Sequence, residues 1–378
     1  MMRALAALAA LVLAALAPAA GEEAAPPQGR IWKGTLGTQA ITACFGEEYT
    51  RDGLYYSDEA RVPLRLVARE ESDRPTFTET AGREDETGAA WELEPGAGDT
   101  LTGTWRKGDR AVPIRLTAVP VRLPPYGSAC ETSAFLDPLL GGGVVRSERA
   151  ALEGTAYTAL AYQGPERAGL DGYIIASFEL DPLRPGDAAI NRALAAALPD
   201  GTAADAMGQC LGQSLPTGIS GSIEEARVPV LLTARWLTVR HAGSAYCGGA
   251  HPSHFSTLTV FDRGSGQEVD PASWFSPGVL LFYEWDPEPG QPLPIAGLSQ
   301  ALLRAVLARF PDREDRAECL AMAGEGMGWQ IGLAREGPLF VPQFPHVAFA
   351  CTEEIMLPWV AARPFLSPEG LAVMASLR

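Results

Sequence analysis

The sequence predicts an α+β protein with two folded parts: an N-terminal all-β barrel or curved sheet, and a C-terminal mixed domain of antiparallel sheet with packed helices. Short alternating segments separated by turn residues fill residues 31–122, which is typical of antiparallel strands. Longer alternating segments follow, interspersed with segments of helical period. The six cysteines are spaced two by two along the chain, as expected if each pair closes one folding unit.

The chain begins with a leader typical of exported proteins. Arg3 precedes an Ala/Leu/Val run that ends in small residues, so residues 1–20 are predicted to be a cleavable signal peptide. The apolar run is shorter than the ~20 residues that a spanning helix needs. We therefore expect no membrane insertion after cleavage and a periplasmic or secreted protein. Residues 21–30, rich in Glu, Ala and Pro, are predicted to be a disordered leader.

Residues 31–122 are predicted to form the β-rich domain. Their strands are evenly spaced and no helical period lies between them, which indicates a small barrel or a strongly curved sheet. The predicted strands are residues 31–36, 40–45, 53–57, 62–68, 76–80, 89–93, 101–105 and 112–119.

Residues 123–146 are predicted to be a linker, because Pro124-Pro125 and Gly141-Gly142-Gly143 bracket a segment without periodicity. Residues 147–378 then form the second, α+β domain. In its first helix, residues 186–198, apolar side chains recur every four residues and indicate a face laid on a sheet.

Residues 228–241 alternate without interruption and are predicted to form one long strand. A Gly-rich connection and a second strand, residues 254–262, follow. A short helix is predicted after the Asp270-Pro271 start signal. The other predicted elements are strands 155–163, 172–180, 329–334, 339–343, 347–351 and 355–360, and helices 298–310, capped near Ser299, and 314–323.

The cysteines favour disulfides over zinc or redox roles. Their number is even, the leader indicates an oxidising compartment, and no Cys-x-x-Cys occurs. Six cysteines allow 15 connectivities. The order along the chain favours pairing of neighbours, which gives Cys44–Cys130, Cys210–Cys247 and Cys319–Cys351.

The connection SAYCGGAHP, residues 244–252, is the most unusual stretch of the chain. A metal site is disfavoured because His251 and His254 are three apart in a strand and so face opposite sides. We expect no metal and no cofactor. A nucleophile pair of Cys247 and His251 remains an alternative, although a bridged Cys247 is favoured. The preferred interpretation is structural: Gly248 and Gly249 adopt positive φ, which lets two strands join sharply.

No other motif assigns a catalytic residue. Gly264-Ser265-Gly266 lies in a predicted hairpin turn and lacks the nucleophile-elbow pattern. Gly324–Gly328 lies between a helix and a strand, the reverse of the order in a dinucleotide site. Paired carboxylates are candidates for glycoside hydrolysis, and solvated acidic loops explain them equally well. These pairs are Glu224-Glu225, Glu353-Glu354, and Asp286 with Glu288.

The segment Tyr246-x-Gly248-Gly249-Ala250-His251, with the strand and turn that follow it, resembles the GGAH signature of the RsiV-like extracytoplasmic domain family. The resemblance covers residues 150–366. That family includes a lysozyme-binding anti-sigma factor ectodomain and a domain in front of a peptidoglycan deacetylase. The resemblance implies binding rather than catalysis. Its candidate binding residues here are Tyr246, Gly248, Gly249, Ala250 and His251.

The charge balance narrows the class of partner. The chain has a net charge of −16, and loss of Arg3 with the leader makes it −17. Such a balance disfavours nucleic acid and anionic lipid. With the family resemblance, it favours a non-enzymatic envelope protein that binds a cationic, lysozyme-like protein or cell-wall peptidoglycan. The alternatives are a structural envelope protein without a ligand and a cell-wall hydrolase.

Overall fold

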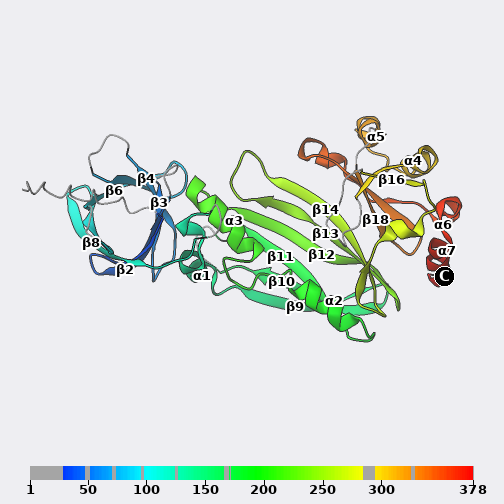
Figure 1. The fold of residues 1–378 in the computed structure, drawn as a ribbon, viewed down its shortest axis with the longest axis horizontal. Coiled ribbons are helices and arrows are strands. Elements are labelled where there is room, and N and C mark those ends of the chain that lie inside the picture. Colours follow the sequence, from blue (N-terminus) through cyan, green and yellow to red (C-terminus); the bar gives the residue numbers. More distant parts are fainter. Residues whose placement is uncertain are drawn as a thin grey trace, which may run out of the picture.

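The computed structural model describes residues 29–46, 52–69, 74–94, 98–123, 127–165, 170, 172–283, 294–324 and 328–377. Three parts follow one another along the long axis of the molecule: a closed barrel, a seven-stranded sheet with two helices, and a lobe built on a five-stranded sheet (Figure 1). The predicted signal peptide and most of the leader lie outside the described residues. Among the residues described, no helix combines the length and apolarity needed to cross a bilayer.

The N-terminal part is a closed barrel of eight antiparallel strands, which confirms the predicted fold. Alternation explains its core: in β6, Ala89, Trp91 and Leu93 are buried, whereas Glu92 between them is exposed. Pairing of β1 with β8 closes the barrel. The strands are β1 (Ile31–Leu36), β2 (Gln39–Phe45), β3 (Gly53–Ser57), β4 (Leu64–Ala68), β5 (Thr76–Thr80), β6 (Glu86–Glu94), β7 (Thr100–Lys107) and β8 (Arg110–Val119).

The barrel encloses the carboxylate of Glu79, which is 4% exposed. It accepts hydrogen bonds from the hydroxyls of Tyr55 and Thr87 and from Nε1 of Trp105. Burial and the adjacent Glu79 raise the pKa of Tyr55. The carboxylate is therefore satisfied by three donors, as a buried polar group must be.

The segment predicted to be a linker contains the 3₁₀ helix η1 (Ala129–Glu131) and helix α1 (Ser133–Leu140). Phe135 of α1 is fully buried, and its carbonyl accepts a hydrogen bond from the hydroxyl of barrel residue Tyr56 at 3.0 Å. The disulfide Cys44–Cys130 fastens η1 to β2. The domain boundary at residues 123–146 stays a prediction, but this segment is helical and packed rather than extended.

The central sheet has the order β15-β14-β13-β12-β11-β10-β9 and is antiparallel except between β11 and β12. Its strands are β9 (Val144–Leu152), β10 (Thr155–Gln163), β11 (Tyr173–Leu180), β12 (Ser222–Leu232), β13 (Trp236–Tyr246), β14 (Ser253–Asp262) and β15 (Gln267–Val269). Strand β9 begins inside the predicted linker and was not predicted.

Two helices cover one face of this sheet. Helix α2 (Asp187–Ala195) is the predicted amphipathic helix, and its Ile190 and Leu194 pack on the sheet. Helix α3 (Ala206–Ser214), followed by η2 (Leu215–Thr217), was not predicted. Its Leu211 packs with Tyr173 and other core residues.

The prediction of one strand over residues 228–241 is wrong, because the run folds into the β12–β13 hairpin. Thr233 makes the turn. Its backbone N–H donates to the carbonyl of Trp236 at 2.9 Å, and its side-chain oxygen accepts from the Trp236 N–H at 2.8 Å. This turn uses Thr233-Ala234-Arg235 rather than Gly, Pro or Asn, so the sequence carries no strong turn signal.

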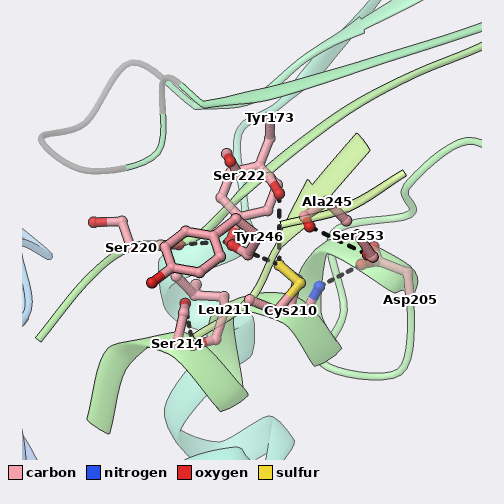
Figure 2. The surroundings of a disulfide bond; sticks show 12 residues. Tyr173, Asp205, Cys210, Leu211, Ser214, Ser220, Ser222, Ala245, Tyr246 and Ser253 are labelled. Atoms are coloured by element: carbon pink, nitrogen blue, oxygen red, sulfur yellow. Dashed lines mark hydrogen bonds between the residues drawn. A yellow bond between two sulfur atoms is a disulfide. The ribbon is translucent and has the colours of Figure 1, made fainter. Parts of the chain in front are cut away.

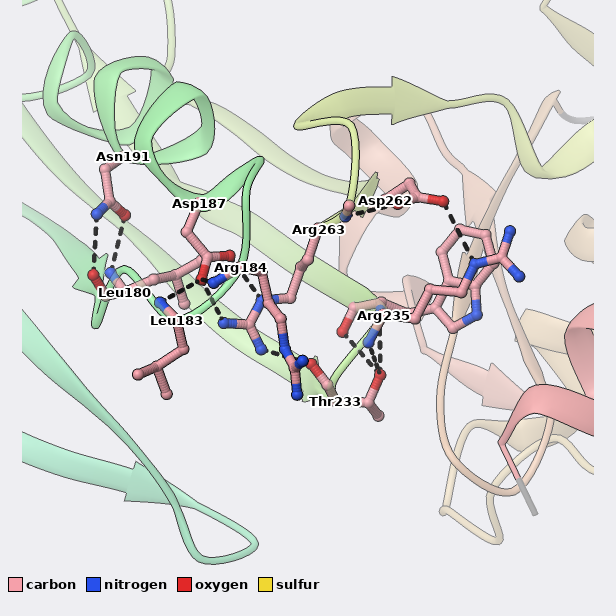
Figure 3. A network of polar contacts seen from close by, with 11 residues as sticks. Leu180, Leu183, Arg184, Asp187, Asn191, Thr233, Arg235, Asp262 and Arg263 are labelled. Atoms are coloured by element: carbon pink, nitrogen blue, oxygen red, sulfur yellow. Dashed lines mark hydrogen bonds and ion pairs between the residues drawn. The ribbon is translucent and has the colours of Figure 1, made fainter.

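A buried ion pair ties the start of α2 to the far ends of strands β12 and β14. Asp187 is fully buried and accepts two hydrogen bonds from Arg263, each 2.8 Å long (Figure 3). Asp187 also accepts from the backbone N–H groups of Leu183 and Arg184. Arg263 donates in turn to the carbonyl of Thr233 in the hairpin. Asp187 thus accepts four hydrogen bonds and each guanidinium nitrogen of Arg263 donates one, which is what makes such a buried pair tolerable.

The C-terminal lobe packs helices on the sheet β16-β17-β18-β19-β20. Ser299 caps α4 as predicted, accepting from the Leu302 N–H. The bounds are η3 (Pro271–Trp274), β16 (Leu280–Phe282), β17 (Ile295–Leu298), α4 (Gln300–Leu307), α5 (Arg316–Gly324), β18 (Gly328–Leu333), β19 (Pro338–Gln343), η4 (His346–Cys351), β20 (Ile355–Met356), α6 (Trp359–Ala362), η5 (Arg363–Phe365) and α7 (Pro368–Ser376).

Two strand predictions in this lobe are wrong. Residues 347–351 belong to the 3₁₀ helix η4, which begins after Pro345. Of residues 355–360, only Ile355 and Met356 form a strand, and Pro358 caps helix α6. Pro345 and Pro358 are the N-caps of η4 and α6, and neither offers an N–H to a neighbouring strand. The three predicted disulfides are confirmed: Cys44–Cys130, Cys210–Cys247 and Cys319–Cys351.

Candidate functional site

The stretch SAYCGGAHP connects β13 to β14. Gly248 has φ of 87° and Gly249 has φ of 128°, so both occupy backbone conformations that glycine adopts most readily, as predicted. The hydroxyl of Tyr246 donates to the carbonyl of Gly249 at 3.1 Å, and Nδ1 of His251 lies 3.0 Å from the carbonyl of Pro252. Ala250 is exposed. The corner is thus built from its own backbone and side chains; a binding role for these residues stays a prediction.

The disulfide Cys210–Cys247 fastens this corner to helix α3 (Figure 2). Beside it, Tyr173 lies over the helix and donates to the carbonyl of Ser220 at 2.6 Å. Because Cys247 is bonded to Cys210, it offers no free thiol to His251. The alternative of a cysteine nucleophile at this corner is therefore wrong for the oxidised protein.

Three of the chain's four histidines meet at the outer side of the corner. The ring of His346, from η4, stacks on that of His251 with centroids 4.0 Å apart and planes 8° apart. It also stacks on His254, at 5.4 Å and 9°. The sequence predicts that His251 and His254 face opposite sides of a strand. This prediction is wrong, because both rings stack with the ring of His346. We call these three residues the histidine stack.

The face of the seven-stranded sheet opposite α2 and α3 is divided into two halves. Over β13 and β14, the C-terminal lobe covers it: the hydroxyl of Thr238 donates to the carbonyl of Leu333 at 2.6 Å, and Gly332 lies directly against Leu258. Over β9, β10 and β11, no described segment covers it, and Ile174 is 56% exposed there. The second half holds the open groove described next.

Strand register places the groove. Ala161 pairs with both Arg146 and Ala176, and Ala159 pairs with Glu148, so these side chains share one face. That face is opposite the helices, because Ile175, the neighbour of Ala176, is buried in the core that contains α3. The sheet also curls, bringing β9 close to β12. The result is a groove of about 730 Å³ inside the curl.

The groove has a small-residue floor and a mixed rim. Ala159, Ala161 and Ala176 form the floor, and the rings of Tyr157 and Phe178, 5.6 Å apart, line one part of it. The polar residues that line it are Arg146, Ser147, Glu148, Ser177 and Arg227, of which Arg146 and Glu148 share the face of the alanines by register. Such a combination of apolar surface and a few polar groups is typical of sites that bind small or extended ligands.

Glu225 forms an ion pair with Arg227, one of the residues that line the groove. Its carboxylate lies 3.0 Å from Nη1 of Arg227 and 3.0 Å from Nε2 of His241. Burial raises the pKa of Glu225, but the hydrogen bonds from His241 and Arg227 outweigh it, and its pKa is lowered. Arg227 is therefore partly neutralised. Arg146, held by Gln163 at 2.9 Å, is the more available cation of the rim.

Of the carboxylate pairs considered for hydrolysis, the two that the structure describes are not brought together. Glu224 and Glu225 are neighbours on one strand and so point to opposite faces. Glu353 pairs with Arg313 at 2.7 Å, whereas Glu354 pairs with Arg240 at 3.3 Å. Asp286 and Glu288 lie outside the described residues. In the two described pairs, Glu224 is exposed and the other three carboxylates are engaged in ion pairs.

Asp315, Cys319 and Cys351 form the one group with metal-ligand spacing among the residues described. Both cysteines belong to a disulfide, so neither offers the thiolate that a metal would need. Gly264–Gly266 lies in the β14–β15 turn, as predicted. Of the candidate site, sequence reasoning missed the groove and His346, since neither carries a local motif.

Comparison with known proteins finds structural similarity at low sequence identity. No family model and no curated protein matches the chain. One similar solved structure is a DUF3298 family protein from Pseudomonas aeruginosa PAO1, with a TM-score of 0.35, 11% identity, and coverage of 62% of this chain and 97% of that chain. Another is a member of the same family from Bacteroides fragilis NCTC 9343, with a TM-score of 0.37, 12% identity, and coverage of 63% of this chain and 96% of that chain. The RsiV-like resemblance stays a prediction.

Proposed function

We propose that the protein is a non-enzymatic binding protein of the extracytoplasmic space, and that its groove holds a segment of cell-wall glycan. The open groove carries this proposal. Its volume of about 730 Å³ lies in the range of roughly 300–1,000 Å³ that is usual for ligand sites. The three disulfides support the compartment, since such bonds persist in oxidising environments.

The chemistry of the groove suits a sugar chain with carboxylate substituents. The floor of Ala159, Ala161 and Ala176 leaves room for rings to lie flat, and Tyr157 offers an apolar face with a polar tip. Glu148 can accept hydrogen bonds from sugar hydroxyls. Arg146 can bind a carboxylate of the peptide or muramic acid part of peptidoglycan through two parallel hydrogen bonds.

Filling the groove tests the proposal. We expect Ala161→Arg to reduce binding to purified sacculi, and to soluble muropeptides in calorimetric titration, by at least about tenfold, or ~1.4 kcal/mol. The matched control is Ala156→Arg, because Ala156 is an exposed alanine on the same strand whose position in the alternation puts it on the opposite face. Equal binding by both variants would remove the groove as the site.

A cationic protein is the second candidate, favoured by the net charge of −16. Binding to a basic lysozyme-type protein should then weaken steeply with salt, because exposed charges are screened beyond about 8 Å at physiological ionic strength. It should also be insensitive to Ala161→Arg. Release of soluble muropeptides from sacculi by the wild-type protein would instead support the hydrolase alternative, and absence of any binding would support a structural role.

A further inference from the structure

The histidine stack forms a contact between two separately anchored segments. His251 and His254 belong to the β13–β14 connection and the start of β14, whereas His346 begins η4 of the C-terminal lobe. Each segment is held by its own disulfide, the first through Cys247 and the second through Cys351. Phe349 of η4 extends the stack on the far side of His254, with centroids 5.3 Å apart. The rings therefore determine how closely the two segments meet.

The contact is arranged for neutral rings. The centroid of His346 lies 4.0 Å from that of His251 and 5.4 Å from that of His254, so protonation of two rings places like charges at van der Waals distance. In addition, Nδ1 of His346 is shielded from solvent and has no hydrogen-bond partner among the residues that the structure describes. Nδ1 of a protonated imidazole is always a donor, and there its N–H would stay unsatisfied.

Electrostatics adds to this arrangement. Desolvation, followed by the charges of His251 and His254, lowers the pKa of His346 below its ordinary value. For a base whose pKa is lower in the folded than in the unfolded state, the unfolded chain binds more protons. The contact is therefore fully stable above pH ~6.5, the ordinary histidine value, and is lost as the pH falls through the lowered value.

The two carboxylates that follow η4 form ion pairs with arginines. On the segments packed around the stack, Glu353 is engaged by Arg313 and Glu354 by Arg240. The stack also differs from a metal site as it stands. The lone pair of an imidazole nitrogen lies in the plane of its ring, so near-parallel planes keep the lone pairs of these rings apart. A metal ion needs nitrogen lone pairs that converge on one point.

We propose that the histidine stack is an acid-sensitive contact: it holds the β13–β14 connection against η4 at neutral pH and releases it when the surroundings become mildly acidic. Histidine is the side chain suited to such a switch, because its charge changes between pH 5 and 8. The two disulfides stay intact during release, so the opening is local and reversible. This inference is independent of the groove.

Hydrogen–deuterium exchange of the full chain at pH 7.5 and pH 5.5, corrected for the intrinsic pH dependence of exchange, tests the proposal. In the wild type we expect exchange of residues 247–251 and 346–351 to rise several-fold at pH 5.5, while helix α2 stays unchanged. His346→Phe keeps a stacked aromatic ring without a proton site, and should remove the pH dependence in both segments.

Two controls complete the experiment. His241→Gln changes the histidine outside the stack and should behave as the wild type. If His346→Phe does not fold, His251→Phe takes its place, with an equal expectation. Exchange that is the same at both pH values in the wild type, or a rise that persists in the phenylalanine variant, would overturn the proposal.

Discussion

The face of the seven-stranded sheet opposite α2 and α3 has two halves, which differ in what covers them. Over β13 and β14, Leu258 and Val260 lie beneath the C-terminal lobe, and Val260 is 1% exposed. Over β10 and β11, the corresponding positions are Ala159, Ala161 and Ala176, and the groove lies above them. The covered half thus carries Leu258 and Val260 under the lobe, whereas the floor of the groove is made of alanines beside Tyr157 and Phe178. Substitutions in the covered half should therefore reduce stability, whereas substitutions in the uncovered half should reduce binding.

The largest effect is expected at the ends of the covered strands, where Asp187 binds Arg263. Asp187→Ala leaves the guanidinium of Arg263 buried without its partner, which costs about 3–5 kcal/mol in the free energy of unfolding. Chemical denaturation followed by tryptophan fluorescence measures it. Asp181→Ala is the control beside the uncovered half, because Asp181 pairs with Arg149 in solvent, and we expect no measurable change. Equal losses in both variants would contradict the comparison.

A smaller effect is expected where the lobe meets the sheet. A Cβ added at Gly332 would lie 2.6 Å from Cδ1 and 3.1 Å from Cβ of Leu258. Gly332→Val should therefore push the two sheets apart and reduce stability by about 1–3 kcal/mol. The same denaturation measurement on Ala161→Val, in the groove, should show a change within about 0.5 kcal/mol. If Ala161→Val were the more harmful, the groove would be packed rather than open.

The smallest effect is expected at the ion pair that joins the lobe to the uncovered half. Nε of Arg335 lies 2.6 Å from the carboxylate of Glu153 in the β9–β10 turn, and both side chains are partly exposed. A double-mutant cycle with Glu153→Gln and Arg335→Gln should give a coupling of about 0.2–1 kcal/mol. The coupling should shrink with added salt. A larger, salt-independent value would mean that the lobe also closes over the groove.

Regular alternation made the barrel predictable from sequence. Its strands are short, most inward residues are apolar, and the β1–β2, β5–β6 and β7–β8 turns carry glycine, so the prediction of Gly53–Ser57 and Thr76–Thr80 matches the structure. The disulfides were predictable because each pair closes a local unit. The β12–β13 hairpin was not, since alternation continues through Thr233, whose side chain supplies the turn. Alternation in the sequence predicts where a strand ends only when turn residues such as glycine mark that end.

The candidate site was predictable only in part. The positive φ values of Gly248 and Gly249 follow from the sequence, because a close strand connection needs them. His346 is more than ninety residues from His251 in the numbering, and its ring contact depends on how η4 packs. The groove is still less visible. It arises from alanines on neighbouring strands and from the curl of the sheet, and alanine in a strand carries no functional signal of its own.

The bond between Cys44 and Cys130 has a mechanical consequence for the whole molecule. It fixes the barrel to the segment that leads into α1, while Cys210–Cys247 fixes helix α3 to the corner between β13 and β14. Leu136 and Leu139 of α1 share one core with Leu211 of α3. Tension applied to the barrel would therefore travel through two covalent crosslinks and one packed helix pair into the central sheet. Under oxidising conditions the barrel should tumble together with that sheet, and a reductant should leave only the packed core around Tyr56 and Phe135 to hold it there.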